Sequence, residues 1–471
     1  MKNFSLIAII ALLLFTSCNH TGGEKSVYDL IPEGAGKVTR IDADAFLKNA
    51  GCRINGGKVT LSKPVEGVLN SIADPDERSL FQGFIAASAV LDMKNVVVCT
   101  NDNTTAMLCQ VTNPSLMEDY LENNASRTEI DGNTVYMTHD IAVMVKDGVA
   151  VASPRPEQLV KFCEKAEKAP LSRNQAMVDE LSDSSRTMVS LTSKTVNKRR
   201  KRGDRDTNKP LSLRTRYVWL TLHERFIEAE IKLIDEMGEP VFLSDYLQPI
   251  DPEVLSSVPS RAEAIAAIGE PVRFNDLMND FDAYDSDLIA EAAPMSLLCD
   301  MLHGSAVISA TPASTATYLK TMTPPAWNIT ASVGQSTEDS GSIKALLSLF
   351  LPQADELRPE TVDGQMCYTL GPDLNLYVAD EPGMLTMSTD MIADGDPDPA
   401  ITSLFTDAYF GIVVNVPYKS ETMKAFNLPY GPNFTMAGYY DGVRMRLSLN
   451  GSNTAIMEAL CETCQAVEQG R

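Results

Sequence analysis

The chain has 471 residues, and its formal net charge is −23 because 63 Asp and Glu residues outnumber 40 Lys and Arg residues. This length is enough for two or three domains with substantial cores. The acidic balance argues against non-specific binding of nucleic acid or of anionic membranes by the body of the protein, and it favours solubility. We therefore expect no nucleic acid among its partners.

The first 18 residues have the features of an export signal. Lys2 gives a basic start, Leu6 to Phe15 form an apolar run, and Thr16-Ser17 precede Cys18. The apolar run is about half of the ~20 residues that a membrane-spanning helix needs, so we expect residues 1–17 to be a removable signal peptide. The pattern resembles the lipobox of bacterial lipoproteins, which implies that Cys18 becomes a lipid-bearing N-terminus. A plain signal peptide is the alternative.

A short polar tether and a mixed strand and helix pattern follow. Residues 18–29 are mostly small and polar, as is typical of a linker. Beyond it we predict a helix over Asp44–Asn49 capped by Asp44, and a helix that starts at Asn113-Pro114. Two more helices are expected from Ser153-Pro154 to Lys165 and from Asn174 to Leu181. The expected strands are Val38–Ile41, Ile85–Leu91, Val96–Thr100, Ala106–Val111 and Thr187–Leu191.

An internal repeat organises the chain. The stretch Ile130–Ser153 reads as three short strands opened by Asp131-Gly132, and Val362–Thr389 repeats it with Asp363-Gly364. Two further pairs match in the same order: residues 30–42 with 257–269, and 216–234 with 434–449. We predict an α+β protein of two similar tandem domains, an internal duplication over 30–253 and 254–471. Each domain is expected to be a mainly antiparallel sheet packed with helices. In the second copy, Ser342–Leu351 is the expected counterpart helix and Ala408–Val416 the late strand.

A basic segment without counterpart in the second copy separates two strands of the first. Lys194–Arg216 contains ten Lys and Arg residues in an otherwise acidic chain. The composition permits an anion-binding loop, and a solvated loop is the alternative. The candidate anion-binding residues are Lys198, Arg199, Arg200, Lys201 and Arg202.

Eight cysteines remain besides Cys18, a number that could pair in an oxidising compartment. Cys99 and Cys109 flank a predicted turn and could face each other. Cys461 and Cys464 form a CxxC in the expected C-terminal helix Thr454–Gln469. The acidic neighbours of this CxxC disfavour redox catalysis, so two ordinary thiols are the preferred interpretation, and a zinc site lacks its other ligands.

The sequence contains no catalytic motif, and we expect no catalytic residue, no cofactor and no firm metal site. Asp394, Asp396 and Asp398 alternate in a loop and are a weak calcium candidate, for which a plain turn is the alternative. Tyr217, Trp219, Thr221 and His223 fall on one face of a predicted strand. They could form a platform for a sugar, or the aromatic rings could pack beneath a helix. His20, His139 and His303 lie in separate segments without metal-ligand spacing.

The opening of the mature chain, Ile31–Gly51 (IPEGAGKVTRIDADAFLKNAG), together with the lipobox and the duplicated body, resembles a family of lipoproteins. These are the Bacteroides-type lipoproteins grouped as domain of unknown function 4836. The resemblance implies an envelope location and the duplicated architecture. It brings no catalytic residues.

Two functions remain open at this stage. The first is a non-catalytic envelope lipoprotein, tethered to the membrane by its lipid, that binds an envelope protein or a glycan. The alternative is a hydrolase of glycan or peptide that uses a carboxylate pair. A cavity holding two carboxylates at a matched separation would favour the enzyme. An outer-membrane anchor is expected, on the periplasmic face or at the cell surface.

Overall fold

The chain divides into two compact units. Unit 1 comprises Met1–Glu239 with Ser452–Cys461, and unit 2 comprises Pro240–Gly451 with Glu462–Arg471. The domain boundary expected after residue 253 lies inside the short helix α8 (Pro252–Leu255). The computed structural model describes residues 26–55, 58–71, 78, 90–101, 104–138, 141–197, 211–235, 239–272, 304–312, 327–334, 358, 360–371, 374–381, 383–392, 395 and 397–469.

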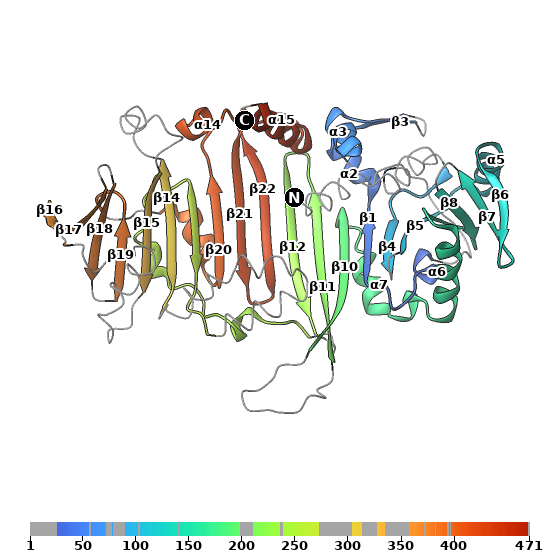
Figure 1. Cartoon of the computed structure of the whole chain (residues 1–471), viewed down its shortest axis with the longest axis horizontal. Helices are drawn as coiled ribbons and strands as arrows, with labels where there is room; N and C mark the ends of the chain where they lie inside the picture. Colours follow the sequence, from blue (N-terminus) through green and yellow to red (C-terminus); the bar gives the residue numbers. More distant parts are fainter. Residues whose placement is uncertain are drawn as a thin grey trace. The chain divides into compact units, whose positions relative to one another are not determined.

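The strands of unit 1 pair only with antiparallel neighbours (Figure 1). In spatial order they are β12 (Phe226–Ile234), β11 (Leu211–Leu222), β10 (Met188–Asn197), β1 (Lys37–Ile41), β4 (Val96–Asn101), β5 (Thr104–Gln110), β9 (Val149–Ser153), β8 (Ile141–Lys146), β7 (Asn133–Thr138) and β6 (Ser126–Ile130). A separate hairpin joins β2 (Arg53–Asn55) to β3 (Lys58–Thr60).

The described strands of unit 2 follow the same order, strand for strand. They are β22 (Gly442–Asn450), β21 (Gly431–Tyr439), β20 (Phe410–Asn415), β13 (Ala264–Ile268), β14 (Ala306–Pro312), β15 (Trp327–Gly334), β19 (Met384–Ser388), β18 (Leu374–Glu381), β17 (Gln365–Gly371) and β16 (Glu360–Val362). Both units are therefore α+β and built on antiparallel sheets, which confirms the predicted class.

The Asp-Gly turns have the backbone that their sequence predicts. Asp131 and Gly132 both have positive φ, 48° and 76°, and they join β6 to β7 in a two-residue turn. Asp363 and Gly364, with φ of 50° and 85°, do the same between β16 and β17. Two successive positive φ values suit the right-handed twist of a tight hairpin, and Asp and Gly tolerate them better than most residues.

Two helix starts test the capping predictions. Helix α5 (Pro114–Asn124) begins as predicted, with the Asn113 side chain accepting the Leu116 N–H at 3.1 Å. The predicted cap of α2 (Ala43–Asn49) is wrong by two residues. Asp42 accepts the Ala45 N–H at 2.9 Å, whereas Asp44 already lies in the first turn and pairs with Lys48. Asp42 has the extended backbone that a cap requires.

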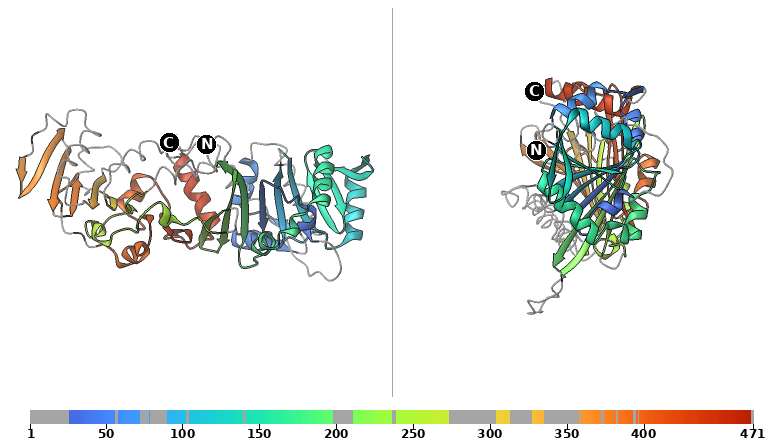
Figure 2. Two further views of the ribbon diagram at one scale, coloured as in Figure 1. Left: turned by 90° about the horizontal axis from the view of Figure 1, so that it is seen from below. Right: turned by 90° about the vertical axis from the view of Figure 1, so that its right-hand side faces the viewer.

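Helices cover both faces of the unit 1 sheet (Figure 2). One face packs against η1 (Val27–Leu30), α6 (Pro156–Lys168), η3 (Leu171–Arg173) and α7 (Gln175–Leu181). On the other, Asn49 of α2 donates to the Leu222 carbonyl at 2.6 Å, and α3 (Lys63–Ser71) follows.

The aromatic rings of β11 pack beneath a helix and do not form a sugar platform. Tyr217 and Trp219 are each 5% exposed, and they belong to the core of unit 1 together with Met177 and Val178 of α7. Their rings stack at 5.6 Å, and Lys232 lies over Trp219. Alternation correctly placed the two rings on one face of β11. The alternative, packing beneath a helix, is the one that the structure supports.

Cys99 and Cys109, whose bonding the sequence left open, do not face each other and are both free thiols. Cys99 lies opposite Ala106 in the β4–β5 ladder, and Cys109 is three positions further along β5, so the two thiols point to opposite faces. Cys99 is buried in the core, where desolvation raises its pKa to about 12. Cys109 donates to the Asp92 carbonyl at 2.7 Å. Both thiols are therefore disfavoured as thiolates.

The basic segment is partly strand. β10 continues to Asn197, which pairs with Leu211 at the start of β11, so the expected loop is shorter at both ends than predicted. The backbone ladder of this hairpin extends into residues whose composition indicated a loop. Residues 198–210, with the five candidate anion-binding residues, lie outside the described part of the chain.

One core cluster of unit 2 lies on a single face of its sheet. Ile265, Val307 and Val413 from three neighbouring strands pack with Val254 of α8 and with Phe405 of α13 (Pro399–Phe405). The other described elements of the second half are η4 (Leu243–Asp245), α14 (Glu421–Ala425) and the C-terminal helix α15 (Ile456–Gln469).

A buried carboxyl joins α14 to this sheet. Glu263 is 5% exposed and precedes β13, and its Oε2 accepts the Thr422 hydroxyl of α14 at 2.6 Å. Burial raises the pKa of Glu263 above its ordinary value of 4.5, and the hydrogen bond from Thr422 offsets part of this shift. The folded protein therefore holds this proton more tightly than the unfolded chain.

This shift predicts a pH-dependent effect of Glu263→Gln. The stability that Glu263 contributes is complete below pH 4.5 and is lost as the pH rises through the raised pKa. The amide of Glu263→Gln does not ionise. As the pH rises from 4 to 7, the free energy of unfolding of this variant should therefore increase relative to that of wild type. Urea titrations at several pH values measure the difference. Glu253→Gln, on the exposed side of α8, is the control, and a constant difference for Glu263→Gln would contradict the prediction.

Candidate functional site

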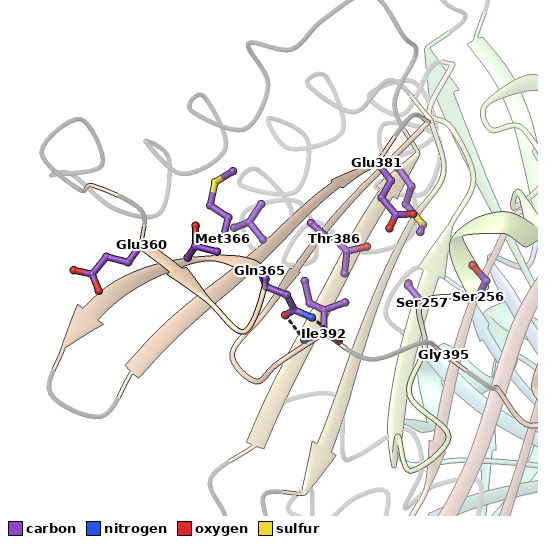
Figure 3. A pocket seen from close by; sticks show the side chains of 14 residues that line it. Ser256, Ser257, Glu360, Gln365, Met366, Glu381, Thr386, Ile392 and Gly395 are labelled. Carbon is purple, nitrogen blue, oxygen red and sulfur yellow. Dashed lines mark hydrogen bonds between the residues drawn. The ribbon is translucent and has the colours of Figure 1, made fainter.

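A cavity of about 860 Å³ opens in unit 2 beside β17, β18 and β19 (Figure 3). Its lining comes from these strands, from β16, from the residues after α8 and from the segment that follows β19. The lining residues are Ser256, Ser257, Glu360, Thr361, Gly364, Gln365, Met366, Val378, Ala379, Glu381, Met384, Thr386, Ile392 and Gly395.

The connection after β19 explains why space remains here. In unit 1 residues 154–187 join β9 to β10, and in unit 2 residues 389–409 join the equivalent strands β19 and β20. The unit 2 connection is shorter by 13 residues, which is the length of α6. Its described residues form one helix, α13, which packs against β20 as α7 packs against β10. Within the described residues of this connection, α6 has no counterpart.

In unit 1, α6 covers the face on which the cavity of unit 2 lies. Five of its side chains are buried, and this side of the helix packs against Met144 of β8 and Val149 and Val151 of β9. Apolar burial of this kind stabilises by about 25 cal/mol per Å² of covered surface. The buried side chains of α6 are Leu159, Val160, Phe162, Cys163 and Ala166.

The strand register identifies the equivalent positions in unit 2. Met144 pairs with Val151 across β8 and β9, and Ala379 pairs with Thr386 across β18 and β19. One step further out, Lys146 pairs with Val149 and Glu381 with Met384. A small residue and a hydroxyl thus replace a methionine and a valine. The surface that receives α6 in unit 1 is less apolar in unit 2.

The same change continues into the neighbouring strand. Ala106 and Leu108 of β5 correspond by register to Thr330 and Ser332 of β15. In unit 2 these hydroxyls pair across β15 and β19. Thr330 and Ser388 are 3.0 Å apart, and Ser332 and Thr386 are 2.9 Å apart. These four side chains are at most 9% exposed, so the cross-strand pairs supply the hydrogen bonds that buried hydroxyls need.

A second wall of the cavity is held by backbone contacts. The Gln365 side chain donates to the Ile392 carbonyl at 2.5 Å and accepts the Ile392 N–H at 2.9 Å. Gly395 packs so closely on the turn after α8 that a Cβ would lie 1.9 Å from the Ser256 carbonyl oxygen. The amide and the glycine therefore fix the segment that closes this side (Figure 3).

The carboxylates of the cavity do not form a pair. Glu360 and Glu381 both line it, but Figure 3 shows them at opposite ends. Within the described part of the chain neither forms an ion pair, and the lining contains no Lys, Arg or His. Among the described residues, the cavity therefore presents a glutamate at each end without a basic partner, and these two carboxylates do not face each other as in a glycosidase.

The remaining candidate residues do not meet in a site. Asp398 caps α13 by accepting the Ala400 N–H at 2.9 Å, while Asp394 and Asp396 lie outside the described residues. His223 stacks on Phe226, and its Nε2 is 3.4 Å from a Glu228 oxygen. Among the described residues, no group of three His, Cys, Asp or Glu side chains could hold a metal. Also outside the described residues are Cys18, His20, His139 and His303.

Comparison with known proteins adds little. No family model matches the chain, and no curated protein matches it. One solved structure that resembles it is titled "Structure of crystal form I of TP0453". The identity is 9%, the match covers 46% of this chain and 81% of that one, and the TM-score is 0.27. A TM-score this low does not indicate a shared fold.

Sequence reasoning missed the cavity. The useful signal was the length of the connection between two late strands of each unit, residues 154–187 and 389–409, which is shorter in unit 2 by the length of one helix. A second signal was the replacement of apolar residues by Ser and Thr at matched strand positions. Neither signal could be interpreted without the register that pairs the strands.

The close contact at Gly395 predicts that Gly395→Ala destabilises unit 2. The added methyl group collides with backbone rather than with a flexible side chain, so the segment that closes the cavity must move. We expect a loss of about 2 kcal/mol in the free energy of unfolding, as for other overpacked sites.

Urea denaturation measures this loss. Gly34→Ala is the matched control, because a Cβ there meets nothing within 4 Å. Equal stability of the two variants would show that the wall is not held as described.

Proposed function

We propose that this protein is a lipid-anchored lipoprotein of the bacterial cell envelope, and that it binds a partner protein or a glycan without catalysing a reaction. The observation that carries the binding function is the cavity of unit 2. Its volume of about 860 Å³ lies in the range of ligand sites, roughly 300 to 1,000 Å³. Its hydroxyl pairs are satisfied, and its two glutamates lie at opposite ends of the lining (Figure 3).

Internal duplication followed by divergence supports this proposal. We infer that the two units descend from one ancestral domain, because their described strands share one order and their Asp-Gly turns occupy the same place. A duplicated domain can keep one copy for stability while the other acquires a new surface. In this interpretation unit 1 keeps α6 over its sheet, and unit 2 uses the equivalent surface for binding.

The envelope location rests on the sequence. The basic residue Lys2, the apolar run and Cys18 resemble a lipobox, and the opening at Ile31–Gly51 resembles lipoproteins of domain of unknown function 4836. The helices that the structure describes include none that is long and apolar enough to span a membrane. A lipid on Cys18, placed in the outer membrane, would supply the attachment, on the periplasmic face or at the cell surface.

Lipidation predicts that Cys18→Ala changes the location of the protein. Without the thiol no lipid can be attached, and a protein whose body is this acidic has little affinity of its own for an anionic membrane. We expect Cys18→Ala to move from the membrane fraction to the soluble fraction, measured by fractionation and immunoblotting. Ser17→Ala is the control, because it keeps the thiol. Membrane association of Cys18→Ala at the wild-type level would contradict the anchor.

Binding in the cavity predicts that Ala379→Met weakens it. Met144 occupies the equivalent position in unit 1, so this backbone accepts methionine, and the added atoms fill part of the cavity. Ala310→Met, on the opposite face of the unit 2 sheet, is the matched control.

The probes are soluble peptidoglycan fragments and a library of labelled 15-residue peptides. A probe that binds wild type should bind Ala379→Met at least threefold more weakly, as measured by fluorescence polarisation or calorimetry. Equal affinity would place binding elsewhere. Release of cleavage products that Glu381→Gln abolishes would favour the hydrolase instead.

A further inference from the structure

Unit 1 shows what kind of element this surface receives. Besides its apolar contacts, α6 is held by an ion pair between Glu167 and Lys146 at the end of β8. Lys146, Met144 and Val151 all lie on the face that α6 covers, because they alternate along β8 or pair across to β9. The helix therefore docks through an apolar centre with one carboxylate against a cation at the strand end.

Unit 2 presents the same surface with the opposite charge. By register Glu381 occupies the position of Lys146. It is exposed, it forms no ion pair among the described residues, and the cavity lining contains no Lys, Arg or His. An occupant that docks as α6 does would therefore need a basic side chain where α6 has Glu167, since a carboxylate there would face Glu381.

The apolar part of the cavity suits a side chain of variable shape. Met384 and Ile392 line the cavity, and Met391 next to Ile392 is 44% exposed. Methionine is unbranched and polarisable, so surfaces rich in methionine adapt to different apolar partners. Among the described residues, the lining contains no aromatic ring of the kind that stacks on sugars. These features favour a peptide over a glycan.

We propose that the cavity of unit 2 receives a short amphipathic helix of a partner protein, in the position that α6 takes in unit 1, with a Lys or Arg of that helix against Glu381. This inference rests on the proposed binding function and names the class of ligand. Docking of a helix in a groove is a recurring mode of peptide recognition, in which apolar residues at helical spacing supply the anchors.

The chain itself provides the probe. A labelled peptide with the sequence of residues 155–169 contains the whole of α6, and the same peptide with Glu167→Lys has the charge that Glu381 requires. Both are titrated against the mature full-length chain with Cys18→Ala, under reducing conditions. We expect the Glu167→Lys peptide to bind about threefold more tightly than the unchanged peptide, as for a partly exposed ion pair.

Charge reversal on the protein makes the test specific. With Glu381→Lys the preference should invert, so that the unchanged peptide binds more tightly. Glu360→Lys, at the other end of the cavity, is the matched control and should preserve the order of the two peptides (Figure 3). A peptide that instead displaces α6 from unit 1 would prefer the unchanged sequence, which pairs with Lys146, and would not respond to Glu381→Lys.

The outcomes separate this inference from the proposed function. Inversion by Glu381→Lys, together with an unchanged order of the two peptides on Glu360→Lys, supports a basic helix in the cavity. If Glu381→Lys does not invert the preference between the two peptides, the proposal of a basic helix is wrong. If neither peptide binds while a peptidoglycan fragment binds wild type and not Ala379→Met, the helix is wrong and the binding function stands. If neither a peptide nor a peptidoglycan fragment binds wild type, both are wrong.

Discussion

Both faces of an antiparallel sheet need a cover or a polar surface, and this constraint governs the organisation of each unit. In unit 1 the cover over β8 and β9 is α6, which buries apolar side chains against Met144 and Val151. Removing such a cover while keeping the strands would expose a large apolar patch. The sheet of unit 2 meets the constraint differently, because Ala379 and Thr386 at the equivalent positions make the surface less apolar.

The hydroxyl pairs show how a sheet can support a cavity without losing stability. A hydroxyl buried without a partner costs about 1 to 3 kcal/mol, and this cost would discourage polar residues beneath a closed core. Here Thr330 with Ser388, and Ser332 with Thr386, satisfy each other across β15 and β19. The strands remain registered by these pairs and by the backbone ladder. The space beside them can then hold a ligand rather than a permanent helix.

The comparison of the two units also explains which sequence signals succeeded. Asp131-Gly132 and Asp363-Gly364 predicted their turns because the conformation depends on the residues in the turn itself. Asn113 predicted the start of α5 for the same reason. Tyr217 and Trp219 were correctly placed on one face of β11, but alternation cannot say whether a face meets solvent or a helix. Cys99 and Cys109 were misjudged because their relation depends on the register of β4 with β5.

The sequence by itself determined the α+β class and most of the described strand and helix positions, because local conformational preference and hydrophobic periodicity are encoded in neighbouring residues. It also contained the shorter connection after β19. Only the tertiary structure decided that this shorter connection leaves a cavity beside β17 to β19, and that Glu381 occupies the strand position that Lys146 has in unit 1. These facts depend on contacts between residues far apart in the chain, which set the register and the cover of each face and which no local pattern specifies.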